Sequence, residues 1–182
     1  MALYEHDGAF SVSLSGKELM HSKVTASESL LGRTGVDQIN KDIPTRVLIG
    51  GLGLGFTLKS VLQSGNPKMK VVLAELVPEV IEWNRTYLKA LNGVLLDDPC
   101  VDIKRVDVID LIRNTEPRTY DAILLDVDSG PVAMVDVNND QLYSTSGIRL
   151  MCRVLKKGGR IAVWSAGPDL KFENRLGKFN CK

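Results

Sequence analysis

The sequence is poor in the residues that mark several specialised protein classes. Its 182 residues include two histidines, three cysteines and 5% aromatic side chains. The cysteines, Cys100, Cys152 and Cys181, are odd in number, far apart and unaccompanied by histidine pairs. Such spacing predicts neither a disulfide framework nor a zinc site. We therefore expect buried free thiols and no bound metal.

An excess of one charge and long apolar runs are also missing. Lys and Arg number 23 against 22 Asp and Glu, for a formal net charge of +1. Because a phosphate backbone is bound by an excess of cations, nucleic acid is not an expected partner. No apolar run approaches the ~18 residues of a membrane-spanning helix, and the opening MALYEHDGAF lacks the order of a signal peptide. We expect a cytoplasmic protein without a membrane partner.

What is present fits one globular domain with a short extension before it. The chain is 44% hydrophobic and 25% charged, and its length suits a single domain at ~100–200 residues per domain. We assign residues 1–43 to the extension and residues 44–182 to the main domain. In the extension, the patterns predict a β-hairpin and then a helix, at 10–14, 18–21 and 25–39. Gly32 and Gly35 weaken that helix, so we expect it to be frayed or broken.

Short apolar runs alternate with helical segments along the main domain. The runs, typical of buried strands, cover 46–49, 70–74, 101–106, 121–125 and 160–164. Segments with helical spacing cover 56–63, 78–91, 108–113, 148–155 and 168–176. Strands joined by helical crossovers form parallel sheets with right-handed connections. We predict an α/β fold with a Rossmann-like, doubly wound and mainly parallel sheet, whose C-terminal strands are truncated or disordered because the chain ends soon after the fifth run.

A glycine-rich turn follows the first strand of this sheet. Gly51, Gly53 and Gly55 alternate with leucines directly before a helical segment. Glycines let a ligand approach the backbone, and the helix start beyond them offers unpaired N–H groups, so we predict a nucleotide-like ligand. The NAD fingerprint G-x-G-x-x-G needs glycine at the position of Phe56, which counts against NAD. The alternative is a turn that serves only strand-to-helix packing.

Acidic residues end the next two strands. Glu75 lies 24 residues beyond Gly51, where a carboxylate can accept both hydroxyls of a ribose. Asp107 follows the third strand and can accept a hydrogen bond from an adenine amino group. It is equally suited to be the N-cap of the helix that begins at residue 108.

The fourth strand ends in two acids two residues apart, Asp126 and Asp128. If Val127 is extended, both side chains project to the same side of the carboxyl edge, where ligands bind in open α/β sheets. One of two crowded carboxylates can take a proton from a nucleophile. The alternative is that these acids cap the loop or bind a cation.

These motifs together resemble the spermidine synthase (polyamine aminopropyltransferase) family, within the class I S-adenosylmethionine-dependent methyltransferase fold. The resemblance covers residues 45–166. Beyond the glycine turn and the acids, it rests on Tyr120-Asp121, Gly130-Pro131, Leu142-Tyr143 and the LKKGG segment at 155–159.

The resemblance implies a sulfonium donor, decarboxylated S-adenosylmethionine, held by the glycine turn, Glu75 and Asp107. It implies that Asp126 deprotonates a small amine acceptor and that Tyr143 stands at the acceptor site, where the family has an aromatic residue. Attack of the neutral amine on the methylene beside the sulfonium would transfer an aminopropyl group and release methylthioadenosine. The enzyme would align the two reactants and remove the proton.

The sequence departs from the family pattern at three places. Leu54 occupies the position of an acid that faces the ammonium tail of the donor, and Asp128 comes one residue early for the second acid of its motif. The region before Pro44 is shorter than the family's amino-terminal domain, so we expect a minimal lid or a partner subunit, as in a homodimer.

Other functions stay open. A methyltransferase that uses S-adenosylmethionine itself, with Asp126 or Asp128 orienting an unknown acceptor, is favoured by Leu54. The aminopropyltransferase is favoured by the segment 126–131 and by Leu142-Tyr143. A non-catalytic nucleoside-binding protein is a third possibility, and an NAD oxidoreductase is the least supported.

Overall fold

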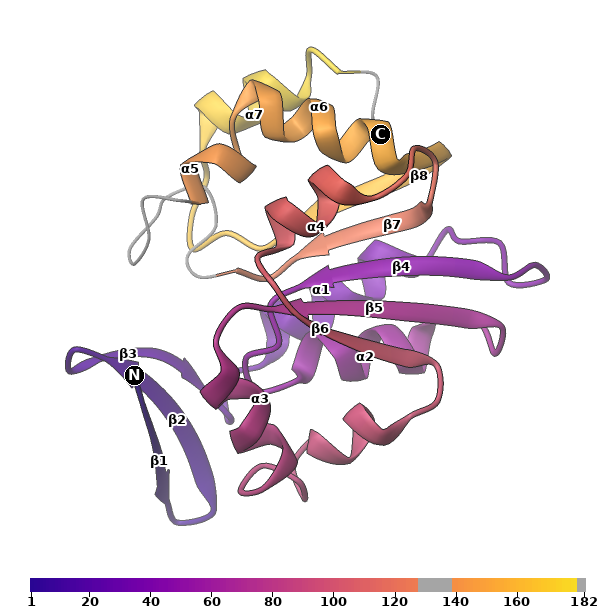
Figure 1. The fold of residues 1–182 in the computed structure, drawn as a ribbon. Coiled ribbons are helices and arrows are strands. Elements are labelled where there is room, and N and C mark those ends of the chain that lie inside the picture. Colours follow the sequence, from indigo (N-terminus) through magenta and orange to yellow (C-terminus); the bar gives the residue numbers. More distant parts are fainter. Residues whose placement is uncertain (128–138, 180–182) are drawn as a thin grey trace.

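The computed structural model describes residues 1–127 and 139–179, which form a five-stranded sheet with helices on both faces and a separate three-stranded sheet (Figure 1). The five strands are β4 (Thr45–Gly50), β5 (Met69–Glu75), β6 (Val101–Arg105), β7 (Tyr120–Leu125) and β8 (Leu155–Val163). They lie in the order β6-β5-β4-β7-β8, and every pairing is parallel. The order reverses at β4, which places the crevice of a doubly wound sheet beyond the ends of β4, β5 and β7.

The helices are α1 (Ala26–Val36), α2 (Phe56–Ser64), α3 (Pro78–Arg85), α4 (Val108–Asn114), α5 (Asn139–Leu142), α6 (Thr145–Val154) and α7 (Leu170–Leu176), with a 3-10 turn, η1 (Gly93–Asp97). Successive strand residues point to opposite faces, so Leu48 packs in one core cluster and Val47 and Ile49 in the other. Helices α4, α6 and α7 contribute to the first cluster, and α1, α2 and α3 to the second. The predicted doubly wound α/β fold is confirmed.

Helix α1 is continuous, so the prediction of a frayed or broken helix is wrong. Its glycines are sites of close packing. A Cβ on Gly32 would lie 2.5 Å from the Ser60 Cβ and 2.8 Å from the Thr57 carbonyl oxygen on α2, and a Cβ on Gly35 would lie 2.7 Å from Leu124. The tertiary contact between α1 and α2 therefore outweighs the low helix propensity of glycine.

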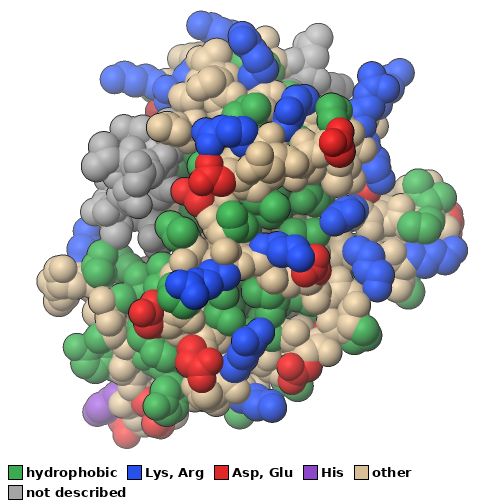
Figure 2. All heavy atoms as spheres, in the orientation of Figure 1, with side chains coloured by type: hydrophobic (Ala, Val, Ile, Leu, Met, Phe, Trp, Pro, Cys, Tyr) green, Lys and Arg blue, Asp and Glu red, His purple; other side chains and the backbone are tan. Residues whose placement is uncertain are grey.

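The extension is a three-stranded antiparallel sheet, one strand more than the predicted hairpin. Its strands are β1 (Ala2–His6), β2 (Ala9–Leu14) and β3 (Lys17–His21). Asp7 and Gly8, with φ of 49° and 70°, make the turn between β1 and β2. An Asp-Gly pair is a strong hairpin signal, and the first strand could have been predicted from it. Hydrophobic side chains gather over this sheet at the lower left of Figure 2.

Two further predictions need correction. The helix predicted for 78–91 ends at Arg85, because Thr86 leaves the helical conformation, with φ of −111° and ψ of −86°, and the Leu88 amide donates to the Trp83 carbonyl oxygen in place of the Asn84 carbonyl oxygen. Cys152 is disulfide-bonded, whereas Cys100 is a free, half-buried thiol. The expectation of free thiols is therefore wrong for Cys152, because spacing along the chain does not report which Cα atoms come within bonding distance. Cys181 lies outside the described residues.

Within the described residues, no helix is long and apolar enough to cross a membrane. The same part of the chain contains no cluster of three or more His, Cys, Asp or Glu side chains that could hold a metal ion.

Candidate functional site

A cavity of about 290 Å³ lies at the carboxyl edge of the parallel sheet. Residues that follow four neighbouring strands line it: Gly51 and Gly53 after β4, Glu75 at the end of β5, Asp107 after β6 and Asp126 after β7. The structure thus brings together five of the predicted site residues at the crevice where ligands bind in this kind of fold. The remaining walls are mainly apolar and include Leu14 and Met20 of the three-stranded sheet, Leu76, Val77, Val80, Val106, Val108 and Val127.

Gly51 allows two loops to meet at the base of this cavity. Its φ is 93°, and a Cβ at this position would collide with the carbonyl oxygen of Asp126. The Asp126 amide donates to the Gly50 carbonyl oxygen at 2.8 Å, which continues the β4–β7 ladder into the loops. Glycine at position 51 is therefore required by the approach of the Asp126 backbone, independently of any ligand.

Gly55 has a different place from Gly51 and Gly53. It is the N-cap of α2 with φ of 80°, and a Cβ here would lie 3.0 Å from the Asn92 Cβ. It is not among the residues that line the cavity. Close packing against Asn92 explains why residue 55 is a glycine. The predicted contact between Gly55 and a ligand has no support in this geometry.

Glu75 connects β5 to the glycine turn. Its side chain is 8% exposed, and its two carboxylate oxygens accept hydrogen bonds from the Leu52 amide at 2.9 Å and the Val77 amide at 2.8 Å. A carboxylate oxygen can accept more than one hydrogen bond, so these contacts are compatible with a ribose hydroxyl as a further donor. Glu75 is thus both a structural brace of the loop and a wall of the cavity.

Asp107 also has two roles. It accepts a hydrogen bond from the Ile109 amide at 2.9 Å and is the N-cap of α4. At the same time it is half-buried and lines the cavity. The N-cap alternative is therefore present in the structure, and it leaves the side chain beside the space predicted for an adenine.

Asp126 is held by a residue that the sequence did not reveal. The Thr57 hydroxyl, on the first turn of α2, donates to Asp126 Oδ2 at 2.6 Å, and Thr57 is only 2% exposed. A buried hydroxyl that donates to a carboxylate fixes the orientation of that carboxylate. Threonine beside a glycine turn has no sequence signature for this role. Asp128 lies outside the described residues.

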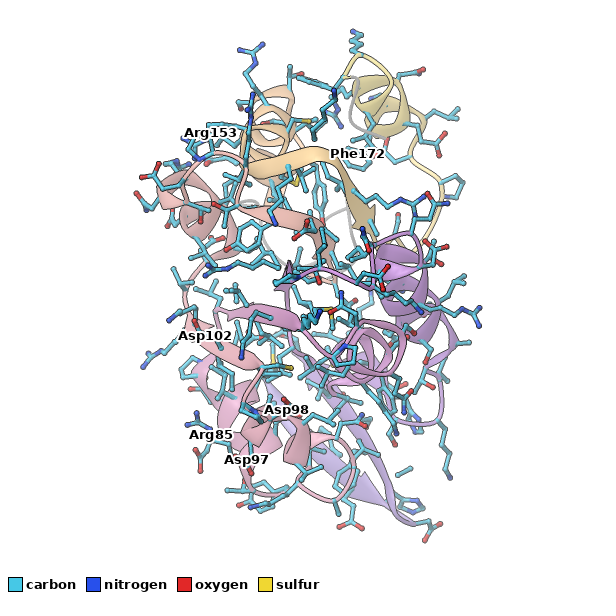
Figure 3. The ribbon with its side chains drawn as sticks, turned by 90° about the vertical axis from the view of Figure 1, so that its right-hand side faces the viewer. Arg85, Asp97, Asp98, Asp102, Arg153 and Phe172 are labelled. Atoms are coloured by element: carbon cyan, nitrogen blue, oxygen red, sulfur yellow. The ribbon has the colours of Figure 1, made fainter. Side chains whose placement is uncertain are left out.

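Two other predicted positions point elsewhere. Leu54 is buried in a small cluster with Val12 and Leu88, so its side chain faces the three-stranded sheet and α3 rather than the cavity. Tyr143 is buried and packs edge-on against Phe172 of α7, with ring centroids 5.3 Å apart. Phe172 is labelled in Figure 3. Tyr143 is not among the described residues that line the cavity.

The cavity carries a net negative charge. Three carboxylates line it, and none of its described lining residues is Lys, Arg or His, whereas Met1, which also lines it, brings one N-terminal ammonium. A site with this composition favours a cation and disfavours a carboxylate.

Comparison with known proteins decides the family. The family model of the spermine/spermidine synthase domain matches residues 29–174. The chain belongs to the spermine/spermidine synthase family. The predicted resemblance is therefore confirmed.

Curated relatives of this family member carry a consistent name. A polyamine aminopropyltransferase of Corynebacterium efficiens is 35% identical over 135 residues, which cover 69% of this chain and 24% of the relative. One of Prochlorococcus marinus is 28% identical over 123 residues, covering 68% of this chain and 41% of the relative. The chain thus spans less than half the length of these relatives.

Solved structures show the same fold. A spermidine synthase in complex with the transition state analogue AdoDATO has a TM-score of 0.76 and 25% identity, over 93% of this chain and 57% of that one. Human methyltransferase-like protein 13 in complex with SAH has a TM-score of 0.58 and 21% identity, over 86% of this chain and 69% of that one. The second likeness shows the fold alone.

Proposed function

We propose that this chain binds decarboxylated S-adenosylmethionine in the cavity at the carboxyl edge and transfers its aminopropyl group to a small amine. The names of the relatives support this activity. The observation that carries it is the net negative charge of the cavity, where three carboxylates outnumber the one described cation, the N-terminal ammonium of Met1. The proposed donor and a polyamine acceptor are both cations without a carboxylate.

The predicted site residues supply the proposed donor contacts. The turn at Gly51 and Gly53 receives the nucleoside, Glu75 accepts the ribose hydroxyls, and Asp107 accepts from the adenine amino group. All four residues line the one cavity, and their contacts with the loop and with α4 preorganise them for a ligand.

Asp126 is the proposed general base, and Asp128 and Tyr143 are proposed to assist at the acceptor. Asp126 takes a proton from the acceptor ammonium, and the neutral nitrogen attacks the methylene beside the sulfonium. A C–N bond forms, and the C–S bond breaks with its electron pair left on sulfur. The products are neutral methylthioadenosine and the alkylated ammonium. The hydrogen bond from Thr57 keeps that carboxylate oriented for the transfer.

One observation favours a second function. Leu54 stands where the family has an acid, and its side chain is buried away from the cavity. The glycine turn therefore offers no carboxylate to the ammonium tail of the donor. A methyltransferase that uses S-adenosylmethionine itself is therefore the alternative. The two donors differ by a carboxylate in their tails, which is the group that an acid-lined cavity disfavours.

Calorimetric titration of both donors separates the two functions. We expect decarboxylated S-adenosylmethionine to bind at least ~10-fold more tightly than S-adenosylmethionine, since like charges placed together cost more than 1 kcal/mol. Glu75→Ala should weaken both donors, by ~1–3 kcal/mol for a lost charge-assisted contact, which locates binding in this cavity. Equal or tighter binding of S-adenosylmethionine would favour the methyltransferase instead.

A further inference from the structure

Two buried asparagines hold the carbonyl groups of the glycine turn. Asn84, at the end of α3, donates from Nδ2 to the Gly53 carbonyl oxygen at 2.9 Å. Asn92, just before η1, donates from Nδ2 to the Leu54 carbonyl oxygen at 2.8 Å. The two side chains are 0% and 2% exposed. Consecutive peptide groups of the turn are thus each held by an amide from a different element.

The orientation of the Asn84 amide is determined by its surroundings. Its two N–H groups are used by two carbonyls, that of Gly53 and that of Val80, both at 2.9 Å. Rotation of the amide by 180° would place its oxygen against both carbonyl oxygens. In the observed orientation, the Oδ1 atoms of Asn84 and Asn92 are buried without a hydrogen-bond partner among the described residues. A buried acceptor without a partner is unfavourable, so packing alone does not explain why asparagine stands at these two positions.

Gly55 lets the two amides approach the turn. A Cβ at Gly55 would lie 3.0 Å from the Asn92 Cβ and 3.6 Å from Asn84 Oδ1. The Gly55 amide in turn donates to the Leu52 carbonyl oxygen at 2.8 Å. The carbonyls of residues 52, 53 and 54 therefore all have fixed partners, and none of them is left to turn toward the cavity.

We infer that Asn84 and Asn92 form an amide clamp that fixes the glycine turn in its ligand-binding conformation before any ligand arrives. Gly53 lines the cavity, and within the described residues its N–H donates to no acceptor, so it is available to a ligand. The clamp residues do not line the cavity themselves. They are positioning residues, whose effect on a nucleoside passes through the peptide groups that they hold. The effect on affinity rests on the proposed function, whereas the effect on the turn does not.

Asn66 provides a matched control for this inference. It is a buried asparagine at the opposite, amino edge of the sheet, where Nδ2 donates to Thr45 Oγ1 at 2.9 Å and to the Asn40 carbonyl oxygen at 3.1 Å. Asn66→Asp removes buried amide donors just as Asn84→Asp and Asn92→Asp do, with almost no change in shape. It does so at a site that makes no contact with the glycine turn.

The experiment compares the three Asp variants by two readouts. Hydrogen exchange of the hydrogen-bonded amides of Gly51, Leu52 and Gly55, without ligand, should accelerate at least ~10-fold in Asn84→Asp and Asn92→Asp, and remain unchanged in Asn66→Asp, since loss of either clamp bond loosens the turn that these amides belong to. Titration with 5′-methylthioadenosine should show a dissociation constant raised at least ~10-fold in the first two variants and unchanged in the third. Melting temperatures, measured alongside, should fall in all three.

The outcomes separate the clamp from the proposed function. Unchanged exchange in Asn84→Asp and Asn92→Asp, or equal acceleration in Asn66→Asp, would overturn the clamp. Accelerated exchange in a protein that does not bind methylthioadenosine would support the clamp and count against the proposed function. Unchanged affinity beside accelerated exchange would overturn the part of the inference that assigns the clamp to ligand binding.

Discussion

At the residue scale, most side chains of the candidate site serve the fold and the cavity at once. Glu75 braces the glycine turn, Asp107 caps α4, and Gly51 makes room for the backbone of Asp126. A sequence pattern could identify these residues because strand ends, caps and glycine turns have local signatures. Thr57 and Asn84 have none, since their partners lie 69 and 31 residues away in the sequence.

Cys100 supports a prediction about reactivity at the amino edge of the sheet. Burial raises the pKa of the Cys100 thiol to about 11, and its hydrogen bond with Asp98 and the charge of that carboxylate act in the same direction. Asp98 is labelled in Figure 3. At pH 8 we expect iodoacetamide to modify Cys100 about 100 times more slowly in the folded than in the unfolded protein, because only the thiolate reacts. Peptide mapping by mass spectrometry gives both rates, and equal rates would contradict the assignment.

The same shift gives stability a pH dependence with a defined sign. The folded thiol has a pKa of about 11, above the 9.0 of an unperturbed cysteine. Between these values the unfolded chain has lost a proton that the folded chain retains, so this contribution to stability is complete below pH 9 and is lost as the pH rises toward 11.

At the scale of single elements, the helices and strands could be predicted where their cause is local. All five strands of the parallel sheet were predicted from short apolar runs, and the start of α3 from Pro78. A helix was also predicted where α1 lies, but its continuity could not be, because its glycines are explained by Ser60 and Leu124, which belong to other elements. The end of α3 was missed for a related reason: apolar spacing continues to Leu91, while the chain already turns at Thr86.

Gly32 provides the test of this account of α1. Alanine in a helix is normally favoured over glycine by ~1 kcal/mol. Here a Cβ would lie 2.5 Å from the Ser60 Cβ and 2.8 Å from a backbone oxygen of α2, so we expect Gly32→Ala to lower the free energy of unfolding by ~1–3 kcal/mol. Urea denaturation measures this change.

Gly177 is the matched control for that substitution. It is the C-cap of α7 with φ of −60°, and a Cβ there would meet its nearest neighbours at 3.6 and 3.9 Å, which is ordinary contact. Gly177→Ala should leave the free energy of unfolding unchanged or slightly raised. A loss of the same size in both variants would show that the close packing of α1 on α2 is not the cause.

At the scale of the whole molecule, the sheet topology determines which residues come together at the candidate site. The four acidic or glycine-bearing segments of the candidate site are spread from residue 51 to residue 126, and the reversal of strand order at β4 brings them to one cavity. The sequence pattern was sufficient to predict this convergence. It was not sufficient to predict that Leu14 and Met20 of the three-stranded sheet would line the same cavity, because no local signal specifies how the extension packs.

The proposed function requires that this cavity perform aminopropyl transfer with Asp126 as the base. The test is mass spectrometry of the products formed from decarboxylated S-adenosylmethionine and a mixture of small polyamines. It compares the wild type with Asp126→Asn and with the control Asp102→Asn. Asp102 is an exposed acid outside the cavity. We expect methylthioadenosine from the wild type and from Asp102→Asn, and formation at least ~100-fold slower in Asp126→Asn, the scale of a lost general base. The claim would be contradicted by an equal rate in Asp126→Asn, or by S-adenosylhomocysteine as the product from S-adenosylmethionine while the decarboxylated donor gives none.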